Sequence, residues 1–497
     1  MLFSSWQFIL LFLPVSVVIY HLLCRLQQPY VSRLWLVGAS LFFYGYWDAR
    51  YLALIVASIL GNYGFGRLLN WIGGSGYSYA SEPTALAKIL LAVGIALNLI
   101  VLGYFKYAGF FMQNLNVVAG TSFPVTQIVL PLAISFFTFT QIVYLVDSYR
   151  KETGHYGLTN YSLFVLFFPH LIAGPIVQHS QIMPQFEARE ARTFSYEYIN
   201  LGALIFSIGL FKKLVLADTL AMWADSGFDG NGPISIYGAW AASLSYTFQL
   251  YFDFSGYCDM AIGASLFFNI VLPVNFYSPY KALNIQDFWR RWHITLSTFL
   301  RDYLYIPLGG SRGGEARTCI NILITFLLGG LWHGATWMFV LWGAAHGIGL
   351  VTFRVWSKIG FKLPAFLAWG ITFMFINLTW VLFRANTTDS ALRIYSGMLN
   401  WRSAFSSDIR AIPVSDIAWT GKAGDYLSTI LPINFIGQIL PVVCILLAAL
   451  VATAKNSIEI SSQPIDLGKI LGAALLFGFA LQFALAGSSP VFLYFNF

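Results

Sequence analysis

Long runs without a single Lys, Arg, Asp or Glu residue dominate the pattern of hydrophobic and polar positions. They cover residues 1–24, 107–146, 231–252, 318–353, 363–383, 426–454 and 470–497. A helix that crosses a bilayer needs about 20 mainly apolar residues, so each run is long enough for one. Shorter uncharged runs at 34–47, 51–66 and 89–105 fit tilted spans or re-entrant elements. The pattern predicts an all-α polytopic membrane bundle with about 11–14 membrane-embedded helices, some re-entrant, around a central cavity or tunnel.

The run at 318–353 has room for a helix, a break and most of a second helix. We interpret Gly329, Gly330 and Gly334 as that break. We expect a single integral-membrane domain over residues 1–497. Its last part, 386–497, would supply a polar loop and two C-terminal transmembrane helices.

Composition agrees with this pattern. Hydrophobic residues make up 58% of the chain and charged residues only 10%, and the mean hydropathy is +0.69. A soluble domain carries about 25% charged residues, so this chain cannot cover a water-facing surface. The net charge of +7 is assigned to basic cytoplasmic loops and membrane lipid rather than to nucleic acid.

The cysteines and histidines do not form recognisable clusters in the sequence. The four cysteines are widely scattered, and the seven histidines lack the spacing of metal ligands. We therefore expect neither a disulfide framework nor a metal site, and no tightly bound cofactor.

The segment 281–317, called here the basic aromatic segment, concentrates cationic and aromatic side chains. These are Trp289, Arg290, Arg291, Trp292, His293, Arg301, Tyr303, Tyr305, Arg312 and Arg317. Read as one helix from Asn284 to Tyr303, it places Trp289, Trp292 and His293 on one face. One interpretation is an interfacial helix whose arginines pair with lipid phosphate. The other is a mouth for a phosphate-bearing donor, in which arginines bind phosphate and a tryptophan covers an adenine. The residues alone leave both open.

Two histidines lie inside the uncharged segment LLGGLWHGATWMFVLWGAAHG. An ionisable side chain at membrane depth is costly, and by default it marks a functional site or a water-filled cavity. Histidine suits proton transfer because its ordinary pKa lies near neutrality. The glycines around His333 favour a role for it beside a break, whereas His346 is expected in a packed helix.

Two further segments place polar groups in apolar sequence. Asp253 and Asp259 are expected to be paired, with Lys or Arg of the basic aromatic segment as possible partners. His170 and His179 lie in FFPHLIAGPIVQHSQIMPQF, whose three prolines predict a broken or re-entrant element that lines a cavity.

The pairing of DFWRRWHITLSTFLRDYLYIPLGG with GGLWHGATW resembles the membrane-bound O-acyltransferase (MBOAT) family. The opening MLFSSWQFILLFLPVSVVIY and the proline-rich segment are similar to its bacterial branch of alginate O-acetylation proteins. That branch also contains the D-alanyl transfer protein of teichoic acid modification. The likeness covers about residues 1–385.

This resemblance implies a multi-pass O-acetyltransferase in the bacterial inner membrane, with acetyl-CoA as donor substrate. It would pass acetyl groups across the membrane to a secreted or periplasmic acetyltransferase partner, for O-acetylation of an exopolysaccharide such as alginate. His333 would be the catalytic base, and His293 the second polar position. The donor would be bound by residues of the basic aromatic segment: Trp289, Arg290, Arg291, Trp292, Arg301 and Tyr303. D-alanyl transfer and a transporter without acyl chemistry stay open as alternatives.

Overall fold

The computed structural model describes residues 1–72, 84–125, 128–154, 156–188, 193–405, 433–486 and 493. Within these ranges every regular element is a helix, and none is a strand. This confirms the predicted all-α class. Part of the predicted polar loop after residue 385 falls at 406–432, which lies outside the described residues, and the part before it contains a helix at Thr388–Leu399.

Seven helical stretches of the described part are long and apolar enough to cross a membrane, judged by length and composition. They are Phe8–Arg25, Ala49–Ile72, Ala85–Ala119, Tyr196–Phe228, Trp337–Ile359, Ala365–Arg384 and Leu467–Ala486. A shorter apolar helix covers Ile439–Thr453. The chain is therefore a multi-pass membrane protein.

The Cα positions group into two compact units. The first comprises Met1–Phe206 and Met260–Pro273, and the second comprises Ser207–Asp259 and Val274–Phe497. Helices α10 (Tyr196–Phe211) and α12 (Ile236–Leu266) each run from one unit into the other. The expectation of a single functional domain stays a prediction.

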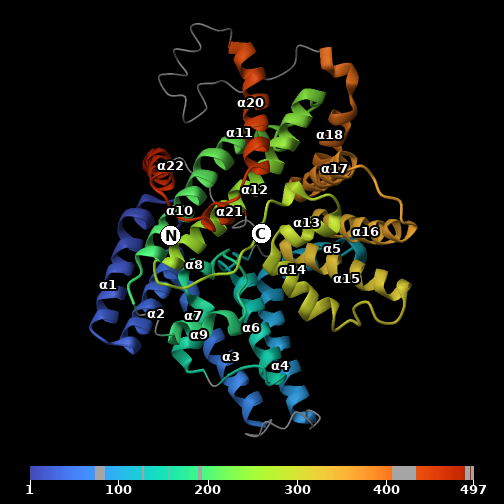
Figure 1. The fold of residues 1–497 in the computed structure, drawn as a ribbon. Helices are drawn as coiled ribbons and strands as arrows, with labels where there is room; N and C mark the ends of the chain where they lie inside the picture. Colours follow the sequence, from blue (N-terminus) through green and yellow to red (C-terminus); the bar gives the residue numbers. More distant parts are fainter. Residues whose placement is uncertain are drawn as a thin grey trace. The chain divides into compact units, whose positions relative to one another are not determined.

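The first unit includes α6 (Ile134–Tyr149), which packs on the helices at residues 52–72, 85–102 and 158–166 (Figure 1). The others are α1 (Leu13–Arg25), α2 (Pro29–Gly45), α3 (Leu52–Ile72), α4 (Ala85–Leu102), α5 (Ala108–Ala119), α7 (Leu158–Leu166), α8 (Phe168–Leu171) and α9 (His179–Glu187). Leu69, Ala87 and Leu145 join α3, α4 and α6 in a buried apolar cluster. The prolines keep α8 to a single turn, which confirms the broken element predicted there.

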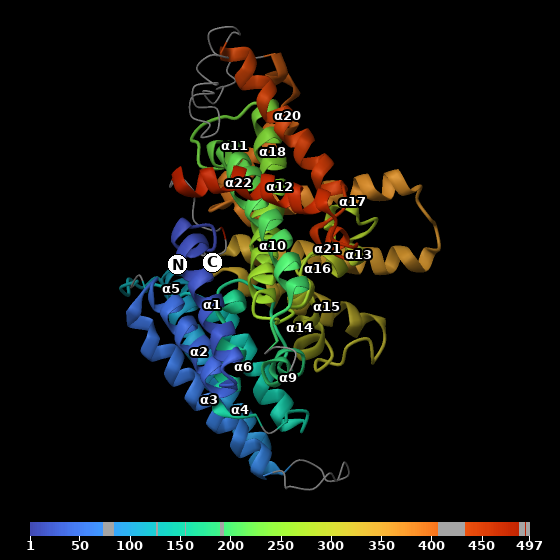
Figure 2. The same ribbon diagram turned by 60° about the vertical axis from the view of Figure 1, so that its left-hand side comes forward.

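The second unit carries a helical hairpin of α15 (Glu315–His333) and α16 (Trp337–Ile359). The two helices lie side by side in both ribbon views (Figures 1 and 2). The remaining helices are α11 (Asp218–Phe228), α13 (Ile285–Arg291), α14 (Ile294–Leu300), α17 (Ala365–Arg384), α18 (Thr388–Leu399), α20 (Ile433–Thr453), α21 (Ser457–Ser461) and α22 (Leu467–Ala486).

The hairpin corrects the predicted position of the helix break. Gly334 has extended backbone after the last residue of α15, whereas Gly329 and Gly330 lie inside that helix. Gly330 instead permits close packing, because a Cβ there would lie 2.3 Å from the carbonyl oxygen of Phe339. Gly343 faces the carbonyl of Phe326 in the same way. These two glycines join the helices, and only Gly334 belongs to the break.

The basic aromatic segment is likewise not one helix. It divides into α13, α14 and a π-helical segment at Arg301–Tyr305, with His293 in the left-handed region at φ 43°. The prediction that Trp289, Trp292 and His293 share one helix face is therefore wrong. The periodicity of the side chains is helical, but the backbone leaves the helix at Trp292, which is extended.

The two buried aspartates are paired, as predicted, but with other partners. Asp259 lies 2.6 Å from the Lys212 ammonium, and Asp253 lies 2.8 Å from that of Lys213. The expected partners in the basic aromatic segment were wrong. Both lysines directly follow α10 in the chain. The helices α10 and α12 approach closely here, because a Cβ on Gly256 would lie 2.8 Å from the carbonyl oxygen of Gly209.

Candidate functional site

Three buried histidines of the second unit lie in a dense group of aromatic rings. We call this group the histidine cage. It comprises His293, His333 and His346 with Phe288, Trp289, Trp292, Trp332, Phe339, Trp342, Trp380 and Phe383. The rings come from α13, α15, α16 and α17, so the cage depends on the hairpin and its neighbours.

His333 is the last residue of α15, and only 3% of its surface is exposed. Its ring centroid lies 5.0 Å from that of Trp342 and 5.1 Å from that of Phe383, both edge to face. The unpaired carbonyls at a helix C-terminus carry partial negative charge, which stabilises a positively charged imidazolium. The same position is buried among apolar rings, which disfavour a charge, so the helix end acts against that cost.

His346 occupies the interior of α16 and has no exposed surface. The indole N–H of Trp289 donates a hydrogen bond to its Nδ1, at 3.2 Å. Because Nδ1 accepts, the proton of the neutral ring lies on Nε2. The expectation of a packed helix is confirmed, and the ring nevertheless directs a donor into the cage.

His293 starts α14 and is completely buried. Its Nδ1 lies 3.1 Å from the side-chain oxygen of Asn275. Burial lowers the pKa of His293 to about 3, so the imidazole is neutral at physiological pH. Sequence reasoning missed Asn275, because no motif links residues that lie 18 positions apart outside a helix.

The donor-binding residues proposed from sequence fall into two groups. Trp289 and Trp292 are buried at 8% and 1% exposure, so neither offers an exposed surface for an adenine. Their role as donor contacts stays a prediction, and the break at His293 places both indoles in the cage. Tyr303 is half-buried and stacks on Phe299.

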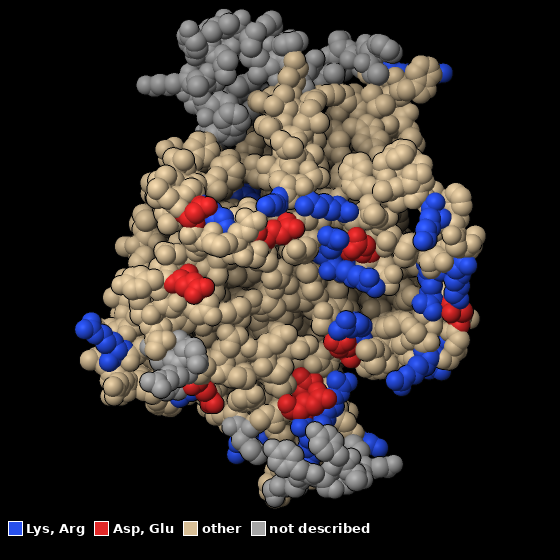
Figure 3. Space-filling view, viewed as in Figure 1, with Lys and Arg blue, Asp and Glu red and all other residues tan. Residues whose placement is uncertain are grey.

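The arginines of that prediction remain near the surface. Arg290 and Arg301 are exposed, and Arg291 is half-buried. Arg291 pairs with Asp287 at 2.9 Å, and Arg301 pairs with its neighbour Asp302 at 2.6 Å. Figure 3 shows Lys and Arg side chains gathered over the region of α13, α15 and α16, with acidic side chains among them.

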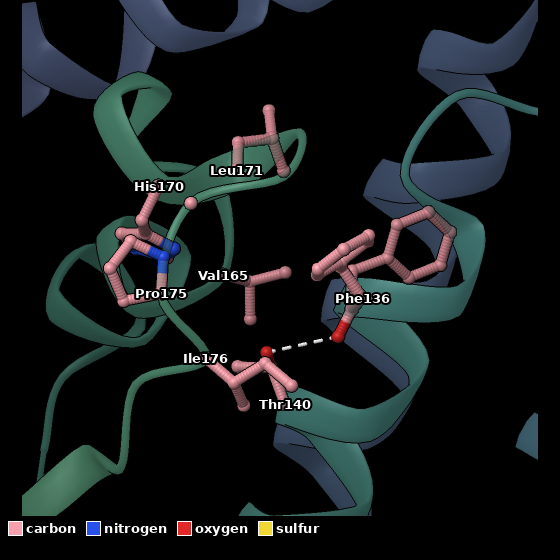
Figure 4. Close-up of a pocket in the computed structure, with 9 residues that line it drawn as sticks. Phe136, Thr140, Val165, His170, Leu171, Pro175 and Ile176 are labelled. Atoms are coloured by element: carbon pink, nitrogen blue, oxygen red, sulfur yellow. Dashed lines mark hydrogen bonds between the residues drawn. The ribbon is translucent and has the colours of Figure 1, made fainter. Parts of the chain in front are cut away.

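A small pocket in the first unit surrounds His170 of α8 (Figure 4). Its other lining residues are Phe136, Phe137, Thr140, Val165, Leu171, Gly174, Pro175 and Ile176. Burial lowers the pKa of His170 to about 3, and its Nε2 has no hydrogen-bond partner among the described residues. His179 is placed differently, since it pairs with the buried Asp147 at 3.0 Å. The broken element thus lines a cavity, as the prolines predicted.

The cysteines do not reach one another. None of the four takes part in a disulfide. Within the described ranges, no three His, Cys, Asp or Glu side chains come together as a metal site would require. The polar groups of the cage named above are imidazole and indole groups.

Comparison with known proteins identifies one family. The sequence profile of the membrane-bound O-acyltransferase family matches residues 79–391. The chain is 44% identical to a peptidoglycan O-acetyltransferase of Helicobacter pylori, over 100% of this chain and 98% of that protein. It is 42% identical to a probable alginate O-acetylase of Pseudomonas aeruginosa, over 81% and 75%. It is 26% identical to a teichoic acid D-alanyltransferase of Streptococcus thermophilus, over 46% and 57%.

Proposed function

The chain belongs to the membrane-bound O-acyltransferase family, and we propose that it moves acetyl groups from cytoplasmic acetyl-CoA toward a cell-envelope polysaccharide. It is an O-acyltransferase that acts on polysaccharide or cell-wall polymers. The observation that carries the proposal is His333, buried in an aromatic cage at the C-terminal end of a helix.

The acyl group is proposed from the names of the relatives. Those that match over most of this chain at 40% identity or more are named for O-acetyl transfer. The relative named for D-alanyl transfer is 26% identical and matches under half of the chain. Acetyl is therefore our first candidate and D-alanyl the alternative.

Two acceptor classes have support. The match to the peptidoglycan O-acetyltransferase extends over the whole chain, including the region after residue 391 that the family profile leaves out. The match to the probable alginate O-acetylase of Azotobacter vinelandii covers 84% of the chain. We place peptidoglycan first on this ground and an exopolysaccharide such as alginate second.

The proposed step is a general-base acyl transfer. The oxygen of an acceptor hydroxyl forms a bond to the thioester carbonyl carbon, and its proton moves to the imidazole of His333. The carbon–sulfur bond then breaks, and the sulfur leaves with the bonding electrons and recovers the proton. The products are an ester and the free thiol of coenzyme A. Indole and imidazole N–H groups of the cage would stabilise the intermediate oxyanion.

The donor is proposed to enter from the cytoplasmic face of the bacterial inner membrane. The exposed guanidinium groups of Arg290 and Arg301 would contact its phosphates, since arginine forks bind phosphate oxygens in pairs. Arg291 and Arg301 would contribute less than Arg290, because Asp287 and Asp302 already pair with them. A secreted or periplasmic acetyltransferase partner would take the acetyl group onward to the polymer.

Replacing His333 with Ala tests this assignment. Thiol release from acetyl-CoA is measured in membranes that contain the full-length chain, together with O-acetyl content of the polymer in cells. Loss of a general base lowers the rate by about 10²–10⁴-fold, while immunoblotting should show normal protein levels. The matched control is His21→Gln, because His21 is half-buried, lies outside the cage, and contacts the backbone oxygen of Phe267 through its Nε2.

Wild-type acetylation in the His333→Ala variant would overturn the assignment. The same preparation tests the transporter alternative. Acetyl flux into vesicles without thiol release would show that the protein transports acetyl groups and does not catalyse their transfer. Extraction of acetylated peptidoglycan, alginate-type polymer or D-alanylated polymer from cells then decides the acceptor and the acyl group.

A further inference from the structure

Asn275 holds three consecutive residues at the break between α13 and α14. Its side-chain oxygen lies 3.1 Å from Nδ1 of His293, and it accepts hydrogen bonds from the backbone N–H and the hydroxyl of Thr295, at 3.2 and 3.0 Å. Its backbone carbonyl accepts from the N–H of Ile294 at 3.0 Å. Its amide nitrogen donates to the Cys258 sulfur at 3.4 Å. Both the oxygen and the nitrogen of this side chain therefore have a partner.

These contacts determine which amide atom faces His293. The oxygen and nitrogen of an asparagine amide are distinguished by the hydrogen bonds they make. A backbone N–H can only donate, so the atom that contacts Thr295 N must be the oxygen. An amide oxygen only accepts, and Nδ1 of His293 must therefore be the donor.

The proton on Nδ1 leaves Nε2 of the neutral ring as an acceptor. That atom is buried, and it has no hydrogen-bond partner among the described residues. Apolar rings surround the imidazole, with Phe254 at 4.8 Å and Phe276 at 6.4 Å between centroids. A buried acceptor without a partner destabilises the folded protein. Burial also keeps the ring neutral, because it lowers the pKa of His293 to about 3.

The backbone at His293 supports the same conclusion. Its φ of 43° lies in the left-handed region, which side chains other than glycine adopt rarely. Such a conformation is unfavourable and persists where the surroundings hold it. The contacts of Asn275 to Ile294 and Thr295 supply that support. Without the left-handed conformation at His293, its Nδ1 would move away from the amide of Asn275.

We propose that Asn275 is a positioning residue that holds His293 protonated on Nδ1, so that Nε2 accepts a hydrogen bond from a substrate O–H or N–H group. This rests on the proposed acyl transfer and changes one part of it. A neutral His293 in this form cannot donate to the thioester oxygen. The donors to that oxygen would instead be the N–H groups of Trp342 and of Nε2 in His346, which have no partner in the described part of the chain.

The tautomer of His293 can be measured independently of enzymatic activity. The full-length protein is labelled with ¹⁵N-histidine and reconstituted in nanodiscs, and its ¹⁵N spectrum is compared with that of His293→Gln. The difference should show a protonated Nδ1 and an unprotonated Nε2. A proton on Nε2 overturns the proposal. His293→Asn serves as the second difference variant if the glutamine variant does not fold.

The second experiment follows the pH dependence of acetyl transfer in Asn275→Asp. A carboxylate can accept the same hydrogen bonds, but its charge raises the pKa of the neighbouring imidazole. The acid limb of the rate should move by about 1–3 pH units toward neutrality, because protonated His293 no longer accepts. At pH 8 the variant should stay within a few-fold of the wild-type rate.

Thr295→Val is the matched control. It removes the hydroxyl contact to the same oxygen but leaves the contact between Asn275 and His293. Its rate falls by a similar factor at every pH, and its acid limb stays in place. An unmoved acid limb in Asn275→Asp would mean that Asn275 only supports the fold.

The outcomes separate this inference from the proposed function. Absence of acetyl transfer in the wild-type protein defeats the function, while the ¹⁵N spectrum still decides the tautomer. Transfer with an Nε2-protonated His293 defeats the inference alone. If Asn275→Asp changes only the KM for acetyl-CoA, the group that contacts Nε2 of His293 is an N–H group of the donor. If it changes kcat, that group is the acceptor hydroxyl.

Discussion

Gly330 joins the two helices of the hairpin one turn before His333, which makes Gly330→Ala a sensitive test of the site. An added Cβ would lie 2.3 Å from the carbonyl oxygen of Phe339 and 3.1 Å from Cα of Gly343. Ordinary Cβ contacts begin at 3.4 Å, so the nearest atom is about 1 Å too close. Both neighbours are backbone atoms, and no side-chain rotation can relieve the contact. The helices must therefore separate.

The size of the effect follows from that displacement. Overpacking a tight contact costs about 1–3 kcal/mol, and the helix preference of alanine over glycine returns about 0.5–1 kcal/mol. The protein should therefore still fold and insert into the membrane. Misplacing a catalytic group by about 1 Å can lower a rate by about 10²-fold. We expect a loss of this order in acetyl transfer, much larger than the loss of stability.

The assay is thiol release from acetyl-CoA in membranes, normalised to the amount of protein and accompanied by a thermal unfolding midpoint in detergent. Gly370→Ala is the matched control, since it lies in α17 and a Cβ there meets nothing within 4 Å. That variant should retain full activity and equal or greater stability. Full activity in Gly330→Ala would refute the reasoning, because it would show that the hairpin spacing does not position His333.

Two further predictions concern buried charge and pH. Asp259→Asn leaves the buried Lys212 ammonium without its counter-charge, which should cost about 3–5 kcal/mol and lower the unfolding midpoint. Asp48→Asn, in the pair with the exposed Arg50, is the control and should change the midpoint little. Equal midpoints for the two variants would contradict this prediction. His170 has a folded pKa of about 3 against 6.5, so its contribution to stability is present above pH 6.5 and is lost as the pH falls toward 3. The midpoint of His170→Gln should fall less steeply over that range, and parallel pH curves would argue against a neutral buried imidazole.

The membrane class and the segments that carry the buried histidines were predictable from sequence. Uncharged run lengths and charge depletion are properties of the chain itself, and a bilayer accepts only helices from such runs. The glycines and histidines at 329–346 identified the hairpin that carries His333, because polar groups at membrane depth are rare. The position of the break within that segment was wrong, since glycines serve close packing as well as breaks.

The cage and the state of its histidines depend on contacts between distant residues. Phe383 reaches His333 from α17, and Asn275 turns the chain at His293 by hydrogen bonds that no local pattern contains. The helical spacing around Trp289 predicted a continuous helix, and tertiary hydrogen bonding overrode it.

Sequence by itself therefore determined that the chain spans a membrane and which segments carry the histidines. Tertiary structure decided which atoms meet: Lys212 with Asp259, and Asn275 with His293. The physical reason is that membrane partitioning sums over the composition of a local segment, whereas a hydrogen bond or ion pair depends on two groups brought within about 3 Å of each other.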